Sequence, residues 1–145
     1  MKNDDFQRAI KITQGASFAQ YINTLSESDS LSEKEKKDVN EKMKSICIEV
    51  IQLLRKAYKK EPTNPGISWE LVKILHLNHL RIVKTGTNSE KVEALKTGFK
   101  ADDGRQIWGY PNMISYHAEM CSKFDSQGRY KNELAKIIYI YKSIM

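Results

Sequence analysis

The stretch WELVKILHLNHLRIVK, Trp69 to Lys84, decides the fold class, because drawn as a helix it is apolar nearly all the way round. Its polar strip is narrow and consists of Glu70, Lys73, Arg81 and Lys84. A helix of this kind is buried among other helices. We therefore expect a central helix with Ser68 as its N-cap and Gly86 as its stop.

The segment before it predicts a long amphipathic helix. Ser32 and Glu35 form a capping-box pattern. Apolar residues then follow at alternating steps of four and three: Val39, Met43, Ile46, Val50, Leu53 and Ala57. Pro62 and the residue before it disfavour a helix, so this one should end before Pro62.

The remaining segments also show helical spacing. Residues 4 to about 25 predict one kinked helix or two short ones, because a glycine such as Gly15 costs a helix about 1 kcal/mol. Further helices are expected from about Ser89 to Thr97, from Pro111 to near Gly128, and from Arg129 to Ser143. The length of 145 residues suits one domain.

The sequence thus predicts an all-α fold, a single-domain bundle of about six helices over residues 1 to 145, with one short loop or β-hairpin insertion near 98–110. The expected core includes Val50, Leu53, Leu75, Leu80, Met120 and Ile137.

Composition excludes several protein classes. The chain is 40% hydrophobic and 29% charged, which is typical of a globular protein. No apolar run approaches the roughly 20 residues that span a bilayer. The acidic N-terminus lacks the basic start of a secretory signal. We therefore expect a cytoplasmic protein with no membrane contact, in which Cys47 and Cys121 are reduced, buried thiols.

Catalytic and metal-binding patterns are weak. His76, His79 and His117 could meet at a metal, but no Glu precedes any of them by three residues, as it does in carboxylate-bridged bundles. The sequence also lacks glycine-rich phosphate loops, HExxH, GxSxG and paired-cysteine motifs. We expect no cofactor, no metal and no enzymatic activity. An enzyme that uses Asp102, Asp103 or Glu119 is the weakest alternative.

The net charge of +6 favours an anionic partner. Arg55, Lys56, Lys59 and Lys60 form the clearest basic cluster, but they lie at the end of a predicted helix, where the helix dipole favours cations anyway. Most of the 24 basic residues are lysines, whereas base and phosphate recognition favours arginine. Nucleic-acid binding is therefore the second hypothesis.

The stretch TGFKADDGRQIWGYPN, Thr97 to Asn112, is the one place where helical patterning stops for more than a few residues. A two-residue turn at Asp103 and Gly104 would make it a hairpin. Its cross-strand pairs would be Asp102 with Arg105, Ala101 with Gln106, Lys100 with Ile107, and Phe99 with Trp108. The stretch would then be a flap over the end of the core.

This flap is also the best candidate for a partner-binding site, because functional residues concentrate on loops held by a rigid scaffold. We expect Arg105 and Tyr110 to face solvent and Phe99 and Trp108 to be at least partly covered by the bundle. The predicted partner-binding residues are Lys100, Arg105, Trp108 and Tyr110. The leading hypothesis is a small protein-binding module, for instance a cognate inhibitor of the immunity-protein or antitoxin kind, or an adaptor.

Overall fold

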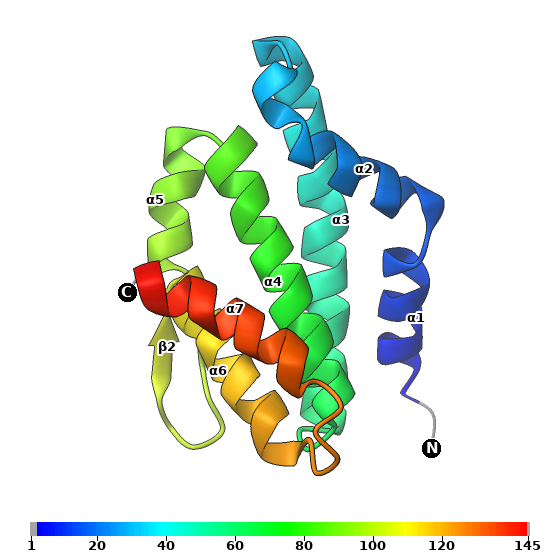
Figure 1. Ribbon diagram of the computed structural model, residues 1–145, viewed down its shortest axis with the longest axis vertical. Helices are drawn as coiled ribbons and strands as arrows, with labels where there is room; N and C mark the ends of the chain where they lie inside the picture. The colour runs from blue at the N-terminus through cyan, green and yellow to red at the C-terminus, as the bar shows by residue number, and fades with distance from the viewer. Residues whose placement is uncertain (1–2, 145) are drawn as a thin grey trace.

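The computed structural model describes residues 3–144, and it confirms the all-α bundle with one small hairpin (Figure 1). The α-helices are α1 (Asp4–Thr13), α2 (Ala16–Ser26), α3 (Glu33–Lys60), α4 (Pro65–Thr85), α5 (Asn88–Lys96), α6 (Tyr110–Phe124) and α7 (Lys131–Ile144). A 3-10 turn, Ser28–Ser30, joins α2 to α3, and strands β1 (Gly98–Lys100) and β2 (Gln106–Trp108) form the hairpin. Within residues 3–144, no helix has the length and apolar character needed to cross a membrane.

Helix α4 is central, as its sequence predicts. It packs against α3 on one side and against α6 on another, while α1 and α2 pack on α3 and α7 packs on α6 (Figure 1). Leu71, Val72 and Leu75 of α4 are fully buried between these neighbours. The layer of α3, α4 and α6 therefore forms the scaffold on which the hairpin rests.

The predicted ends of α3 are confirmed. The Glu35 N–H donates to Ser32 Oγ at 3.2 Å, and the Ser32 N–H donates to Glu35 Oε1 at 3.1 Å, which completes the capping box. The helix ends at Lys60, before Pro62. Gly15 separates α1 from α2, so the first segment forms two short helices.

The prediction that Ser68 caps the central helix is wrong. Helix α4 begins four residues earlier than predicted, at Pro65, and its N-cap is Asn64, whose side chain accepts a hydrogen bond from the Gly66 N–H at 2.9 Å. Proline fits the first turn of a helix because its φ is already helical and the missing N–H has no partner there. Ser68 therefore lies inside the helix, fully buried, and its Oγ has no hydrogen-bond partner among the described residues.

We expect Ser68→Ala to stabilise the protein by about 1 kcal/mol, because it removes an unpartnered buried hydroxyl and improves helix propensity. Urea denaturation of both proteins measures the difference in the free energy of unfolding. A loss of stability of similar size would instead show that the hydroxyl is satisfied in solution.

Three of the predicted core residues are confirmed: Val50, Leu53 and Leu75 are buried. Leu80, Met120 and Ile137 are only partly buried. On α7 the reason is visible, because Leu134 and Tyr141 form the buried line and Ile137 lies beside it. Periodicity identified the correct face of this helix but not how much of that face the neighbours cover.

The hairpin forms with a different register from the predicted one. Phe99 pairs with Ile107, Lys100 with Gln106, and Gly98 with Trp108. The Ala101 N–H donates to the Arg105 oxygen at 2.8 Å, which closes a loop of three residues and not two. Gly104 has a φ of 91°, and a glycine with positive φ is typical of three-residue hairpin loops. This shift of one residue puts Ile107, in place of Trp108, on the face that Phe99 shares.

A buried polar network joins α3, α4, α5 and α6. The Arg81 guanidinium donates through Nη1 to Asn40 Oδ1 at 2.6 Å and to Glu90 Oε2 at 2.8 Å, and through Nε to Asn78 Oδ1 at 2.8 Å. The Asn78 amide then donates to the Tyr110 hydroxyl at 2.6 Å. Arg81 is only 2% exposed, so this network holds a charge inside the bundle.

Candidate functional site

The predicted partner-binding residues divide into exposed and buried ones. Arg105 is exposed, as predicted, and Lys100 is exposed too. Trp108, expected to be at least partly covered by the bundle, is 57% exposed. Tyr110 is only 8% exposed, although it was expected to face solvent. The expectation for Tyr110 is therefore wrong, and Trp108 is more exposed than Phe99.

Tyr110 is buried because the chain turns inward at Gly109. This glycine has a φ of 83°, and its N–H donates to the Thr97 oxygen at 2.6 Å. Tyr110 then starts α6 with its hydroxyl on Asn78 and its ring stacked on His79, with 5.6 Å between ring centroids. The side chain is thus part of the core and is not available to a partner.

Trp108 is exposed because the three-residue loop shifts β2 by one position. It shares the outer face of the hairpin with Gly98, its cross-strand partner. A Cβ atom at Gly98 would lie 2.8 Å from a ring carbon of Trp108, so the indole covers this glycine. The other side of the indole is open to solvent.

Arg105 is exposed but is held in place. Its Nε lies 2.8 Å from Asp103 Oδ2 and its Nη1 lies 3.7 Å from Glu119 Oε2. The guanidinium also lies over the Tyr116 ring, 5.3 Å from the centroid. These contacts join the hairpin loop to α6.

Exposed apolar side chains gather where α5 meets β2. Val92 is 51% exposed and Leu95 is 68% exposed, and because they are three residues apart they share one face of α5. Gly109, directly after Trp108, lies so close to this helix that a Cβ atom there would be 3.2 Å from the Leu95 oxygen. We call Val92, Leu95 and Trp108, with the exposed Lys91 and Lys96, the α5–β2 surface.

A cavity of about 310 Å³ lies between the hairpin, α3, α4 and α6, and we call it the hairpin cavity. Its lining combines aromatic and charged side chains: Arg55, Tyr58, Lys59, Leu71, Phe99, Lys100, Ala101, Asp102, Tyr116 and His117. It brings Lys100 of the predicted site next to two members of the basic cluster of α3. The sequence separates these residues by more than forty positions.

Arg55 is a partly buried cation without an anionic partner among the described residues. Its Nη2 lies 3.5 Å from the sulfur of Met113, and its guanidinium lies over the Phe99 ring, 5.7 Å from the centroid. A thioether is only a weak acceptor. Burial lowers the pKa of Arg55 below its ordinary value, which reflects the cost of removing this charge from water.

His117 is 2% exposed, and its Nδ1 has no hydrogen-bond partner among the described residues. The imidazole is packed among rings: it stacks on Phe99 with centroids 5.2 Å apart and meets Tyr58 and Tyr116 edge to face. Burial first, and the charge of Arg55 second, lower the pKa of His117 to about 3. The ring is therefore neutral at physiological pH and can donate from one nitrogen only.

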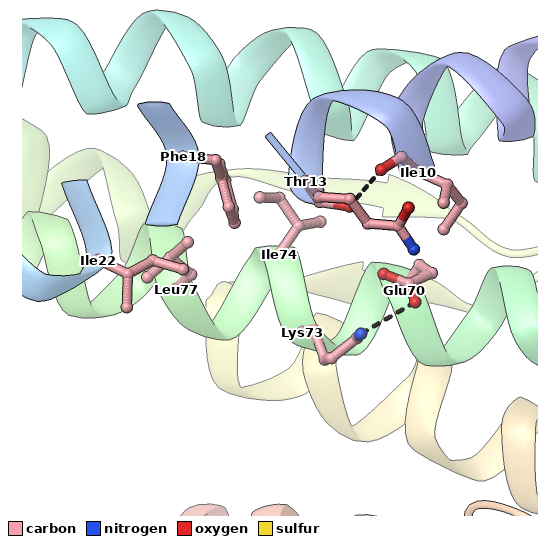
Figure 2. A pocket seen from close by; sticks show the side chains of 9 residues that line it. Ile10, Thr13, Phe18, Ile22, Glu70, Lys73, Ile74 and Leu77 are labelled. Carbon is pink, nitrogen blue, oxygen red and sulfur yellow. Dashed lines mark hydrogen bonds and ion pairs between the residues drawn. The ribbon is translucent and has the colours of Figure 1, made fainter. Parts of the chain in front are cut away.

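A second depression, of about 320 Å³, lies between α4 and the junction of α1 and α2 (Figure 2). Its walls are mainly apolar, with Phe18, Ile74 and Leu77 facing it. The two polar pairs drawn there are internal: Glu70 Oε1 lies 2.9 Å from Lys73 Nζ, and Thr13 Oγ1 donates to the Ile10 oxygen. No unpartnered buried polar atom of the described residues lies there, so it lacks the feature that distinguishes the hairpin cavity.

The structure separates the three histidines. His76 and His79 both lie near the Tyr141 hydroxyl, at 2.7 and 3.4 Å from their Nδ1 atoms, whereas His117 lines the hairpin cavity. Among the described residues there is no group of three or more side chains that could hold a metal ion. Cys47 and Cys121 are buried free thiols, as predicted, and burial raises the pKa of each to about 11.

Sequence reasoning missed the two residues that most distinguish the hairpin cavity. Arg55 was assigned to the basic cluster at a helix end, and His117 was considered as a metal ligand. No local signal distinguishes Arg55 from the next residue, Lys56, which is exposed. For His117, only the packing of the hairpin on α6 creates the cavity.

No protein-family model matches the chain, and neither a curated protein nor a solved structure is similar enough to indicate a relationship.

Proposed function

We propose that this protein is a cytoplasmic, non-enzymatic protein-binding module that recognises its partner through the α5–β2 surface. A cognate inhibitor and an adaptor would both use such a surface. The observation that carries the proposal is that Val92, Leu95 and Trp108, each more than half exposed, lie on α5 and on the end of β2 that adjoins it. Among the described residues, the other large apolar side chains exposed to this degree, Val83 and Tyr139, lie on α4 and α7.

The composition of this surface supports a protein partner. A half-exposed indole supported by a rigid hairpin is a typical binding anchor, because tryptophan contributes a large contact area with few rotatable bonds. Leucine and valine beside it extend the apolar area. Lys91 and Lys96 of α5 are exposed as well. An apolar centre with a charged rim is the usual organisation of an interface between proteins.

The charge of the rim indicates the kind of partner. The chain carries a net charge of +6, and the rim of the α5–β2 surface is mostly lysine. Charge complementarity then favours a protein with an apolar patch surrounded by Asp and Glu.

The positions of the basic residues favour a protein over a nucleic acid. Within the cluster on α3, Arg55 turns inward to the hairpin cavity, and Lys60 pairs with Asp5 at 3.0 Å. Only Lys56 and Lys59 of this cluster remain exposed without a carboxylate partner among the described residues. Two exposed lysines can contact only a few phosphates, which gives weak binding to a nucleic acid.

The test is to identify the partner by pull-down from the native host and then to measure its affinity for variants. We expect the double substitution Leu95→Ser and Trp108→Ala to weaken binding by about 2 kcal/mol or more, because it removes two anchors. The melting temperature should hardly change, since surface substitutions alter stability by about 0.5 kcal/mol.

Ile22→Ala is the matched control, because Ile22 is an exposed apolar residue of α2 at the depression of Figure 2. It should leave the affinity unchanged. If Ile22→Ala weakens binding and the double variant does not, the interface lies at that depression. If sedimentation shows that wild-type protein self-associates through Leu95 and Trp108, the occupant of the surface is a second copy of the chain.

A further inference from the structure

The hairpin cavity contains two polar groups that the protein itself does not satisfy. Arg55 carries a partly buried charge whose nearest polar contact is the sulfur of Met113. His117 is almost completely buried with Nδ1 unpartnered among the described residues. Leaving a buried polar group without a partner destabilises a protein, and leaving a buried charge without one destabilises it more. The cavity lining holds one buried imidazole nitrogen without a partner among the described residues, and a partly buried guanidinium whose contacts are a thioether and a ring. We infer that a ligand supplies the missing partners.

The charged residues around the cavity indicate the sign of the charge on that ligand. Arg55, Lys59 and Lys100 contribute three positive charges to its lining, and Asp102 is the only carboxylate in it. Asp102, Lys59 and Lys100 are exposed, whereas Arg55 lies deeper. An anionic group would therefore be attracted by the two lysines and would meet the guanidinium inside.

The walls define the shape of the ligand. Phe99 and His117 are stacked with an interplanar angle of 8°, and Tyr116 and Tyr58 stand edge-on to His117. These rings present flat apolar surfaces next to the cations. The volume of about 310 Å³ is at the lower end of the range for small-molecule sites.

We propose that the hairpin cavity binds a small molecule with one anionic group, a carboxylate or a phosphate monoester, on a planar apolar body. The Arg55 guanidinium holds the anionic group, and the N–H of the His117 imidazole donates to it. Phe99 and the two tyrosines enclose the planar body. This site is separate from the α5–β2 surface, so it does not depend on the proposed partner.

Isothermal titration calorimetry of the full chain tests the proposal with three probes of one shape class. These are indole-3-acetate, the neutral indole-3-acetamide, and phenyl phosphate. We expect at least one anion to bind saturably at concentrations up to about 1 mM. The amide should bind roughly tenfold more weakly or worse, since a hydrogen bond to a charged group is worth about 1.5–3 kcal/mol. The ratio of the two anion affinities distinguishes a carboxylate site from a phosphate site.

Variants locate the binding. Arg55→Met removes the charge and keeps an unbranched apolar stem, and His117→Phe keeps the ring that stacks on Phe99 but removes its N–H. Each should weaken the anion by roughly tenfold. Lys56→Gln is the matched control, because Lys56 is the next residue of α3, is exposed and does not line the cavity. It should change the affinity by less than roughly twofold.

A measurement on the unmodified protein covers the case in which a variant does not fold. In NMR spectra of the imidazoles, indole-3-acetate or phenyl phosphate should shift the signals of His117 and leave those of His76 and His79 in place. The proposal is overturned if neither anion binds, if the amide binds as well as the acetate, if Arg55→Met binds like wild type, or if the probe shifts His76 and His79 instead.

Discussion

Glu90→Gln is expected to lower the free energy of unfolding by about 3–5 kcal/mol, because it leaves Arg81 as a buried cation without a counter-ion. The carboxylate of Glu90 accepts hydrogen bonds from Arg81 Nη1 at 2.8 Å and from the Asn40 amide at 3.1 Å. Glutamine fits the same space and can preserve the capping contact with Thr87, so the substitution isolates the charge. Urea denaturation near neutral pH measures the loss.

The control for this prediction is Glu93→Gln, at an exposed position of the same helix. It should change the free energy of unfolding by about 0.5 kcal/mol at most. A loss below about 1 kcal/mol for Glu90→Gln would show that water or another group compensates Arg81.

The same pair predicts how stability depends on acid. Burial by itself would raise the pKa of Glu90, but hydrogen bonds from Arg81, Asn40 and the Thr87 N–H lower it from 4.5 to about 2. A carboxyl whose pKa is lowered by folding stabilises the native state above its unfolded pKa. This contribution should be complete above about pH 4.5 and disappear as the pH falls towards 2. The Glu90→Gln variant should lack this part of the acid-induced loss.

Leu75→Ala is expected to lower the free energy of unfolding by about 2–5 kcal/mol, because it opens a cavity in the layer of α3, α4 and α6. Leu75 is fully buried near the middle of α4. Leu80→Ala on the same helix is the comparison, since Leu80 is only partly buried. Leu80→Ala should lower the free energy of unfolding by clearly less than Leu75→Ala does, as measured by denaturant titration. Equal losses at both positions would contradict the burial of the central helix as described.

The helices could be predicted because each depends mainly on signals close together in sequence. The capping box of Ser32 and Glu35 begins α3, and Pro62 limits its end, whatever surrounds the helix. The start of α4 was misassigned to Ser68 because Asn64 offered an equally good cap closer to Pro65. Asn64 and Ser68 are both suitable N-cap residues, and the sequence alone did not show which of them begins the helix.

The hairpin shows where local reasoning fails. Its presence near 98–110 was predicted, but the register depended on whether Asp102 belongs to the strand or to the loop. A shift of one residue in the register moves each side chain to the opposite face of the strand. For this reason Trp108 is more than half exposed, and Ile107 packs on the core with Phe99.

The sequence by itself determined the all-α class, the central position of α4 and the buried thiols, because these follow from residues within a few helical turns of one another. Only the tertiary structure decided that Arg55 turns inward, that Tyr110 joins the polar network of Arg81, and that His117 lines a cavity. Each of these depends on which distant segment packs against a helix face. Helical periodicity specifies that a face is covered, but it carries no information about which side chains cover it.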